Sequence, residues 1–126
     1  MTLIESQHAQ LSDTLSAVYI AEQAQARSIL SALDSVTDGA TGAADVENIA
    51  TAVNAFQLCY LVWHATGSVC MLDVRKALYD CIARSRAELE AFRASLRRKN
   101  DRLRVPTISE LVKLDRLQEQ LAAIGR

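Results

Sequence analysis

The stretch "LVWHATGSV", residues 61–69, decides whether the centre of this chain forms one helix or two. Apolar residues recur at helical spacing on both sides of it, and one helix over residues 44–104 would be about 90 Å long. Such a length is far outside the range usual for a monomer, and it would make a dimer nearly obligatory. Thr, Gly and Ser, which close the stretch, are mediocre helix formers. We therefore expect a break or kink near residues 64–68.

The N-terminal pattern predicts one long helix over residues 3–37, about 50 Å in length. Thr2 and Glu5 have the spacing of a capping box. Asp38–Gly39 is expected to end the helix, because glycine suits the left-handed cap. The apolar residues of the amphipathic pattern are Ile4, Leu11, Leu15, Val18, Tyr19, Ile29, Leu33 and Val36.

Three further helices are expected after the small-residue linker. Asp45 is predicted to be the N-cap of the second helix. The third is expected to end at Val105–Pro106, because the residue before a proline disfavours the α region. Thr107 and Glu110 form a second capping box, which predicts a fourth helix that ends at Gly125.

The composition agrees with this helical pattern. The chain has 126 residues, half of them hydrophobic, with only four glycines and one proline. We predict an all-α fold: an up-down bundle of three to four helices with a long N-terminal helix, in one domain over residues 1–126. Long amphipathic helices in so small a chain leave apolar surface that a second copy could cover, so we expect a homodimer.

Residues 49–72 carry no charged side chain, which allows two interpretations. The stretch is long enough to cross a membrane, but it contains several polar residues and no continuously apolar window of that length. We therefore interpret it as a buried central helix, which is apolar nearly all round, and expect no membrane association. The N-terminus lacks the basic and apolar regions of a secretory signal, so we expect a cytoplasmic protein.

The sequence shows none of the motifs that commonly carry catalysis or hold a metal. Cys59, Cys70 and Cys81 are spaced by eleven residues, about 16 Å along one continuous helix. This spacing suits neither a disulfide nor a zinc site, so we interpret the three as small buried apolar residues. We expect no metal, no cofactor and no enzymatic activity.

The residues around His64 offer a minor alternative. The segment His64-Ala65-Thr66-Gly67-Ser68 resembles the phosphorylated motif of histidine phosphotransfer domains, which are small four-helix bundles. That motif places a lysine three residues after the histidine, where this chain has Gly67. The resemblance covers five residues and implies a phosphoryl-carrying histidine. The other interpretation is a structural histidine beside a tryptophan.

Charge is divided unevenly along the chain. Residues 1–74 hold one basic residue against eight acidic ones, whereas residues 75–126 hold thirteen basic against seven acidic. The basic segment 84–104 suggests a nucleic-acid-binding regulator as an alternative function, although it offers no base-stacking platform. Five arginines of the third helix are expected to share one face: Arg75, Arg86, Arg93, Arg97 and Arg104.

These arginines are our candidate partner-binding residues. One interpretation is that they pair with carboxylates inside the protein, because positions flanking an apolar face commonly do. The acidic residues of the first helix form no matching stripe, so we expect some arginines to remain available for an acidic protein partner. The sequence therefore favours a non-enzymatic protein–protein interaction module, such as an adaptor, a chaperone or a small regulator, which acts through helical faces.

Overall fold

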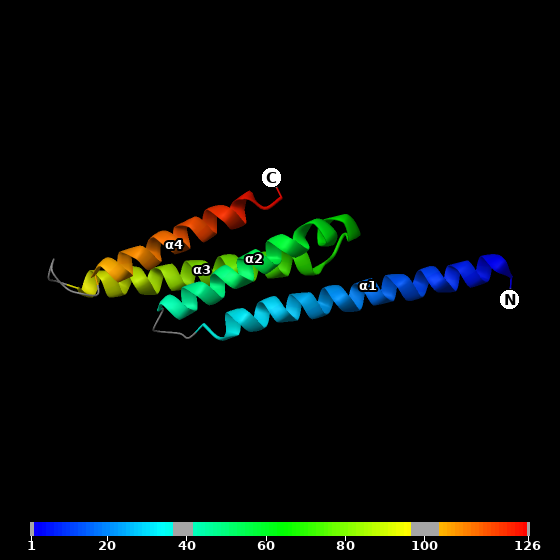
Figure 1. Ribbon diagram of the computed structural model, residues 1–126, viewed down its shortest axis with the longest axis horizontal. Helices are drawn as coiled ribbons and strands as arrows, with labels where there is room; N and C mark the ends of the chain where they lie inside the picture. The colour runs from blue at the N-terminus through cyan, green and yellow to red at the C-terminus, as the bar shows by residue number, and fades with distance from the viewer. Residues whose placement is uncertain (1, 37–41, 97–103, 126) are drawn as a thin grey trace.

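The computed structural model describes residues 2–36, 42–96 and 104–125, except for the side chains of residues 104–106, and these ranges contain helices and no strands. The helices are α1 (Leu3–Asp34), α2 (Ala43–Thr66), α3 (Cys70–Ser95) and α4 (Arg104–Ala123). The expected all-α class with a long N-terminal helix is thereby confirmed. Consecutive helices run in opposite directions in Figure 1, and their packing contacts are consistent with an up-down bundle.

The central pair of the fold is α2 and α3. Both pack against α1 and both pack against α4, whereas the described parts of α1 and α4 make no close approach to each other. Figure 1 shows α1 and α4 on opposite sides of the pair. The core therefore lies along α2 and α3. Its largest fully buried side chains are Trp63, Phe56, Ile49, Leu78, Ile82, Leu114, Leu121, Val53 and Val74.

The break between α2 and α3 is confirmed, and Gly67 makes it. Gly67 has φ +66° and ψ +35°, the left-handed conformation that glycine adopts without a Cβ penalty. Its N–H donates to the His64 carbonyl at 3.3 Å, and the Ser68 N–H donates to the Trp63 carbonyl at 2.9 Å. This pair of bonds is a Schellman motif, which satisfies carbonyls that a helix end leaves without partners.

The start of α1 is as expected, but two other boundaries are not. The Thr2 side chain accepts from the Glu5 N–H and the Glu5 carboxylate accepts from the Thr2 N–H, which confirms the capping box. The helix ends at Asp34, three residues before the expected end, and Asp38–Gly39 lies outside the described residues. The N-cap of α2 is Gly42, and Asp45 sits three residues later, where its carboxylate accepts the Gly42 N–H at 3.3 Å.

The expected boundary between the third and fourth helices was wrong. Helix α3 ends at Ser95, and α4 already begins at Arg104. Pro106 therefore lies in the first turn of α4, where proline is tolerated because the N–H groups there have no partner within the helix. Thr107 is a residue inside α4 and does not cap its start.

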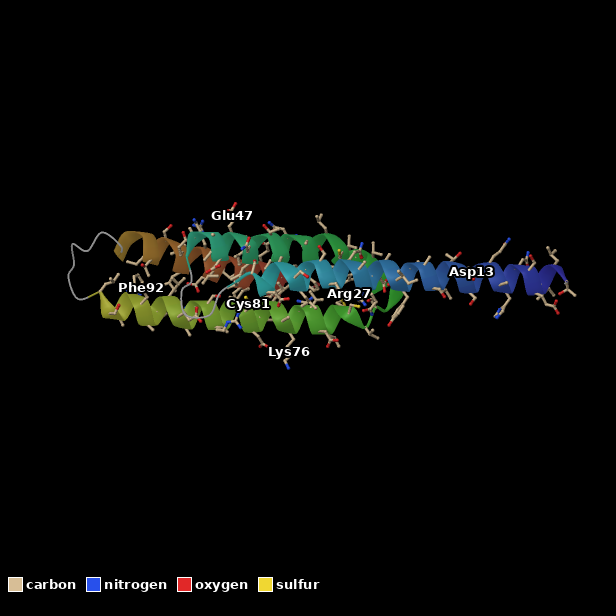
Figure 2. The ribbon with its side chains drawn as sticks, turned by 90° about the horizontal axis from the view of Figure 1, so that it is seen from below. Asp13, Arg27, Glu47, Lys76, Cys81 and Phe92 are labelled. Carbon is tan, nitrogen blue, oxygen red and sulfur yellow. The ribbon has the colours of Figure 1, made fainter. Side chains whose placement is uncertain are left out.

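The predicted core was wrong at two places. Phe92, which the periodicity of the third helix placed in the core, is 43% exposed near the end of α3 (Figure 2). The uncharged stretch 49–72 is not buried all round either. On the outer side of α2, Leu58 is 83% exposed and Leu61 is 77% exposed. The absence of charge in this stretch therefore does not reflect complete burial.

The first part of α1 extends beyond the other helices. Glu22 is the first buried residue of the helix, and residues 3–21 before it are exposed or partly exposed. We call residues 3–21 the arm, which is roughly 28 Å long at 1.5 Å per residue. Both views show the arm leaving the bundle with no other described helix beside it (Figures 1 and 2).

Candidate interaction surfaces

The predicted stripe of five arginines does not exist on one helix. Only Arg75, Arg86 and Arg93 lie on α3, because α3 ends at Ser95. Arg97 lies outside the described residues, and Arg104 begins α4 with a side chain that is not described. The expectation failed because it extended the helical spacing across the α3–α4 connection.

Arg75 holds the end of α4 against the bundle. Its guanidinium donates to the Leu121 carbonyl at 3.1 Å and to the Ile124 carbonyl at 3.0 Å. Its Cζ also lies 5.1 Å from the centre of the Phe56 ring and 5.7 Å from that of Tyr60. The cation thus caps the carbonyl end of one helix and contacts two aromatic rings of another. These contacts point to a structural role for this side chain.

Arg86 and Arg93 both have carboxylate partners within the chain. The Arg86 Nε lies 3.2 Å from Asp115 on α4, and an Arg93 nitrogen lies 3.7 Å from Glu90 one turn earlier. All four side chains are close to half exposed. Exposed pairs of this kind contribute about 0–1 kcal/mol, so a partner can displace them at little cost. Binding of an acidic partner by these arginines stays a prediction.

The junction between the arm and the bundle carries polar contacts from α1 to α2. The Trp63 Nε1 donates to the Gln25 side chain at 2.9 Å, and the Thr66 hydroxyl donates to the buried carboxylate of Glu22. Trp63 itself is fully buried, with its ring edge-on to Phe56 at 6.0 Å between centroids. These contacts place the last turn of α2 at the level of Glu22, and the arm continues past it.

His64 lies in the last turn of the same helix. Its side chain is exposed, and its ring stacks on Tyr60 with 5.5 Å between centroids and an interplanar angle of 18°. Arg75, which contacts the rings of Phe56 and Tyr60, already donates to two carbonyls of α4. The geometry therefore gives His64 an aromatic neighbour, in agreement with a structural role, and the phosphotransfer interpretation stays a prediction.

We predict that replacing His64 with Gln lowers the free energy of unfolding by at most about 1 kcal/mol, the usual worth of an exposed aromatic stack. Urea unfolding of the two proteins measures this difference. Incubation of both proteins with acetyl phosphate provides the chemical comparison. A phosphate label on the wild type that His64→Gln abolishes would restore the phosphotransfer interpretation.

Large apolar side chains are exposed along the arm. Leu11 is 57% exposed, Leu15 61% and Tyr19 56%, and Ile4 near the N-terminus is 77% exposed. They follow the periodicity that the sequence showed, but no described residue of the chain covers them. A row of such residues marks an interaction surface more often than a scatter of single ones does.

A second exposed apolar group, which the sequence reasoning missed, lies at the same end of the bundle. We call Leu58, Leu61 and Val62 the outer face of α2, and they are 83%, 77% and 56% exposed. At 100° per residue they point away from the buried Phe56 and Trp63. That helical projection was the signal available in the sequence. Near the turn, Val69 and Leu72 add exposures of 70% and 71%.

The cysteines are spread over two helices, with Cys59 on α2 and Cys70 and Cys81 on α3. All three are free thiols, two of them buried and Cys59 partly buried. Burial raises the pKa of the Cys59 thiol, and it is also the largest effect that raises the pKa of Cys81. A raised pKa disfavours the reactive thiolate, in agreement with a packing role for these two side chains.

Two further features of the described residues bear on function. They include no group of three or more His, Cys, Asp or Glu that could hold a metal ion. None of the helices in the described part of the chain is long and apolar enough to cross a membrane.

Comparison with known proteins assigns no relative to this chain. No protein-family model, no curated protein and no solved structure matches it. Its function must therefore be argued from its own surfaces.

Proposed function

We propose that this protein is a non-enzymatic protein–protein interaction module that binds other chains through apolar helical faces. The observation that carries the proposal is the position of the exposed apolar side chains, which gather on the arm and on the outer face of α2. Single exposed apolar residues are normal on any protein surface, whereas rows of them mark binding sites. Helical faces with apolar residues at such spacing bind partner helices or grooves.

The two surfaces suit two kinds of partner. The arm is suited to a second copy of the chain, so the proposal includes a homodimer. We propose that this homodimer works in the cytoplasm. The outer face of α2 is left for a different protein. Leu58 and Leu61 on it are 83% and 77% exposed, and residues 49–72 carry no charge that would oppose apolar contact.

Binding of an acidic protein partner, as we predict, would use Arg93 in addition to the two apolar surfaces. A nucleic-acid partner has less support, because Arg75 already donates to two carbonyls of α4 and the predicted stripe of five arginines does not lie on one helix. Phosphate neutralisation needs several available cations on one face.

The test is a quantitative capture experiment in the native host, with a tagged chain and mass spectrometry of what it retains. Leu58→Glu with Leu61→Glu places two charges in the proposed contact and should reduce the retained partner at least tenfold. The matched control is Ala44→Glu with Thr51→Glu, which adds the same charges at exposed positions in the other half of α2. The control should retain the partner like the wild type.

Three results would contradict the proposed function. One is equal retention by the Leu58/Leu61 variant and the wild type. The second is a captured fraction that contains nucleic acid and no protein, released steeply by salt, which would favour the regulator with the basic segment 84–104. The third is the absence of any retained protein with the wild type.

A further inference from the structure

We infer that the arm pairs with the arm of a second copy of this chain, in an antiparallel arrangement with two-fold symmetry. The inference rests on the proposed function, since it takes one of the two exposed apolar surfaces as a binding site and names its occupant. Four observations carry it: the direction of the apolar stripe, its extent, the placement of charge, and the position of α2 and α3 relative to α1.

The apolar stripe of the arm continues the buried face of the same helix. At 100° per residue, Ile4, Leu11 and Leu15 fall within about 40° of one another. The buried residues of the second half of α1 point in the same direction; they are Glu22, Ala26, Ile29 and Leu33. Helices α2 and α3 cover this face up to Glu22, and beyond that residue no described part of the chain does. The stripe is therefore the uncovered continuation of an established helix interface.

The extent of the stripe suits a dimer interface. Its large side chains are Ile4, Leu11, Leu15, Val18 and Tyr19, four of them 56–77% exposed and Val18 partly exposed. At roughly 100 Å² of apolar area each, the four exposed side chains offer about 400 Å² for burial. A standard interface buries about 800 Å² on each partner, and the flanking side chains of a roughly 28 Å arm supply part of the difference.

The placement of charge allows the arms of two copies to pair. Glu5 and Asp13 are the charged side chains between Thr2 and Ala21. Both lie at least about 100° from the centre of the stripe, so two copies in contact would not bring like charges together there. His8 is the polar residue within the stripe, and a single polar residue in an apolar seam commonly fixes the register of helix pairing.

The position of the bundle selects the antiparallel direction. Helices α2 and α3 lie on the stripe side of α1. In a parallel pair, the bundle of each copy would occupy the space that the other copy's α1 needs. An antiparallel pair places the two bundles at opposite ends of the paired arms.

The stripe residues of the two copies meet at the same levels when the two-fold axis passes the arm at Asp13, an offset of about 3 Å from exact overlap of residues 3–21. Leu11 of one copy faces Leu15 of the second, and the reverse, as two-fold symmetry requires. Ile4 then reaches the level of Glu22 and its contact with Thr66 on the second copy, so the interface extends to the end of the bundle.

The first test is the molecular mass in solution at micromolar concentration, measured by light scattering. The wild type should show about twice 13.8 kDa, and Leu11→Glu with Leu15→Glu should show 13.8 kDa. The matched control is Gln10→Glu with Ala17→Glu, which adds the same charges on the other side of the arm and should keep the dimer mass. A monomeric or trimeric wild type would overturn the inference, and so would a dimeric Leu11/Leu15 variant.

The second test measures the direction of pairing without disturbing the stripe. Spin labels are placed at Ser6→Cys or Asp13→Cys, which share the outer side of the arm, in a chain whose Cys59 is replaced by Ser. In the antiparallel dimer, two labels at position 13 lie at nearly the same height along the arms, whereas two at position 6 are about 21 Å apart along them. The distance between labels should therefore be clearly longer at position 6. Equal distances would show parallel pairing and refute the arrangement.

The failure of this inference differs from the failure of the proposed function. A monomeric wild type that still loses its captured partner on Leu58→Glu with Leu61→Glu would refute the paired arms and leave the interaction module standing. A dimeric wild type with the expected label distances and no captured protein would support the paired arms and contradict the proposed function.

Discussion

Replacement of Trp63 with Ala should lower the free energy of unfolding by about 3–5 kcal/mol, the usual cost of removing a large buried aromatic side chain. Trp63 is fully buried against Phe56, and it also supplies the indole N–H that reaches Gln25 on α1. The replacement would therefore leave a cavity in the core and would also remove the contact that holds α1 where it leaves the bundle. The free energy of unfolding of a domain of this size is about 5–15 kcal/mol in total, so the variant would lose much of its stability.

The measurement is urea unfolding followed by circular dichroism, with two variants for comparison. Trp63→Phe keeps a ring in the core and loses the indole N–H, so it should cost less than half as much as the alanine variant. Leu58→Ala removes a side chain that is 83% exposed on the same helix and should change the stability by no more than about 0.5 kcal/mol. Equal costs for Trp63→Ala and Leu58→Ala would contradict the described core.

The second large effect is expected at Arg75. Replacement with Met keeps the apolar stem and removes the guanidinium, leaving the Leu121 and Ile124 carbonyls without this donor. Hydrogen bonds to charged groups contribute about 1.5–3 kcal/mol each, and we expect a total cost of about 2–4 kcal/mol because Arg75 is only partly buried. Arg75→Lys should restore only part of it, since lysine lacks the planar fork that reaches both oxygens.

Arg93→Met is the matched control for this prediction. Arg93 lies on the same helix, is about half exposed and pairs only with the adjacent Glu90 in the described structure. Its replacement should cost at most about 0.5 kcal/mol. Hydrogen exchange adds a local measure, because the amides at the end of α4 should lose protection in Arg75→Met and keep it in Arg93→Met. Similar costs for the two arginines would show that Arg75 does not hold α4.

Local signals in the sequence predicted the parts of the fold that depend on neighbouring residues. The capping box at Thr2 and the end of α2 at Gly67 are each made by hydrogen bonds within a few residues. The end of α3 was wrong because Pro106 was interpreted as a stop signal, whereas proline is equally suited to the first turn of a new helix. The predicted stripe of five arginines was wrong for the same reason, because it relied on a third helix that continued to residue 104.

The features that sequence reasoning missed depend on contacts between distant parts of the chain. Arg75 reaches carbonyls that lie 46 and 49 residues later, and no spacing rule within a helix predicts such an approach. Phe92 fits the apolar periodicity of α3, but it lies near the end of that helix and remains exposed. The exposed outer face of α2 could have been found, because Leu58 and Leu61 project opposite the side that carries Phe56.

The arm has a consequence for the kinetics of assembly. An isolated helix of its length is only marginally stable in water, and most helical stability in proteins comes from packing, which the arm lacks in a single chain. Its capping box fixes one end and the Glu22–Thr66 contact fixes the other, so the helix need not nucleate anew when two chains meet. The turns between these ends are helical, but no other described part of the chain packs against them. In the dimer that we propose, encounter would therefore require little prior folding, dissociation could begin with fraying of a few turns of the arm, and we expect rapid exchange of subunits.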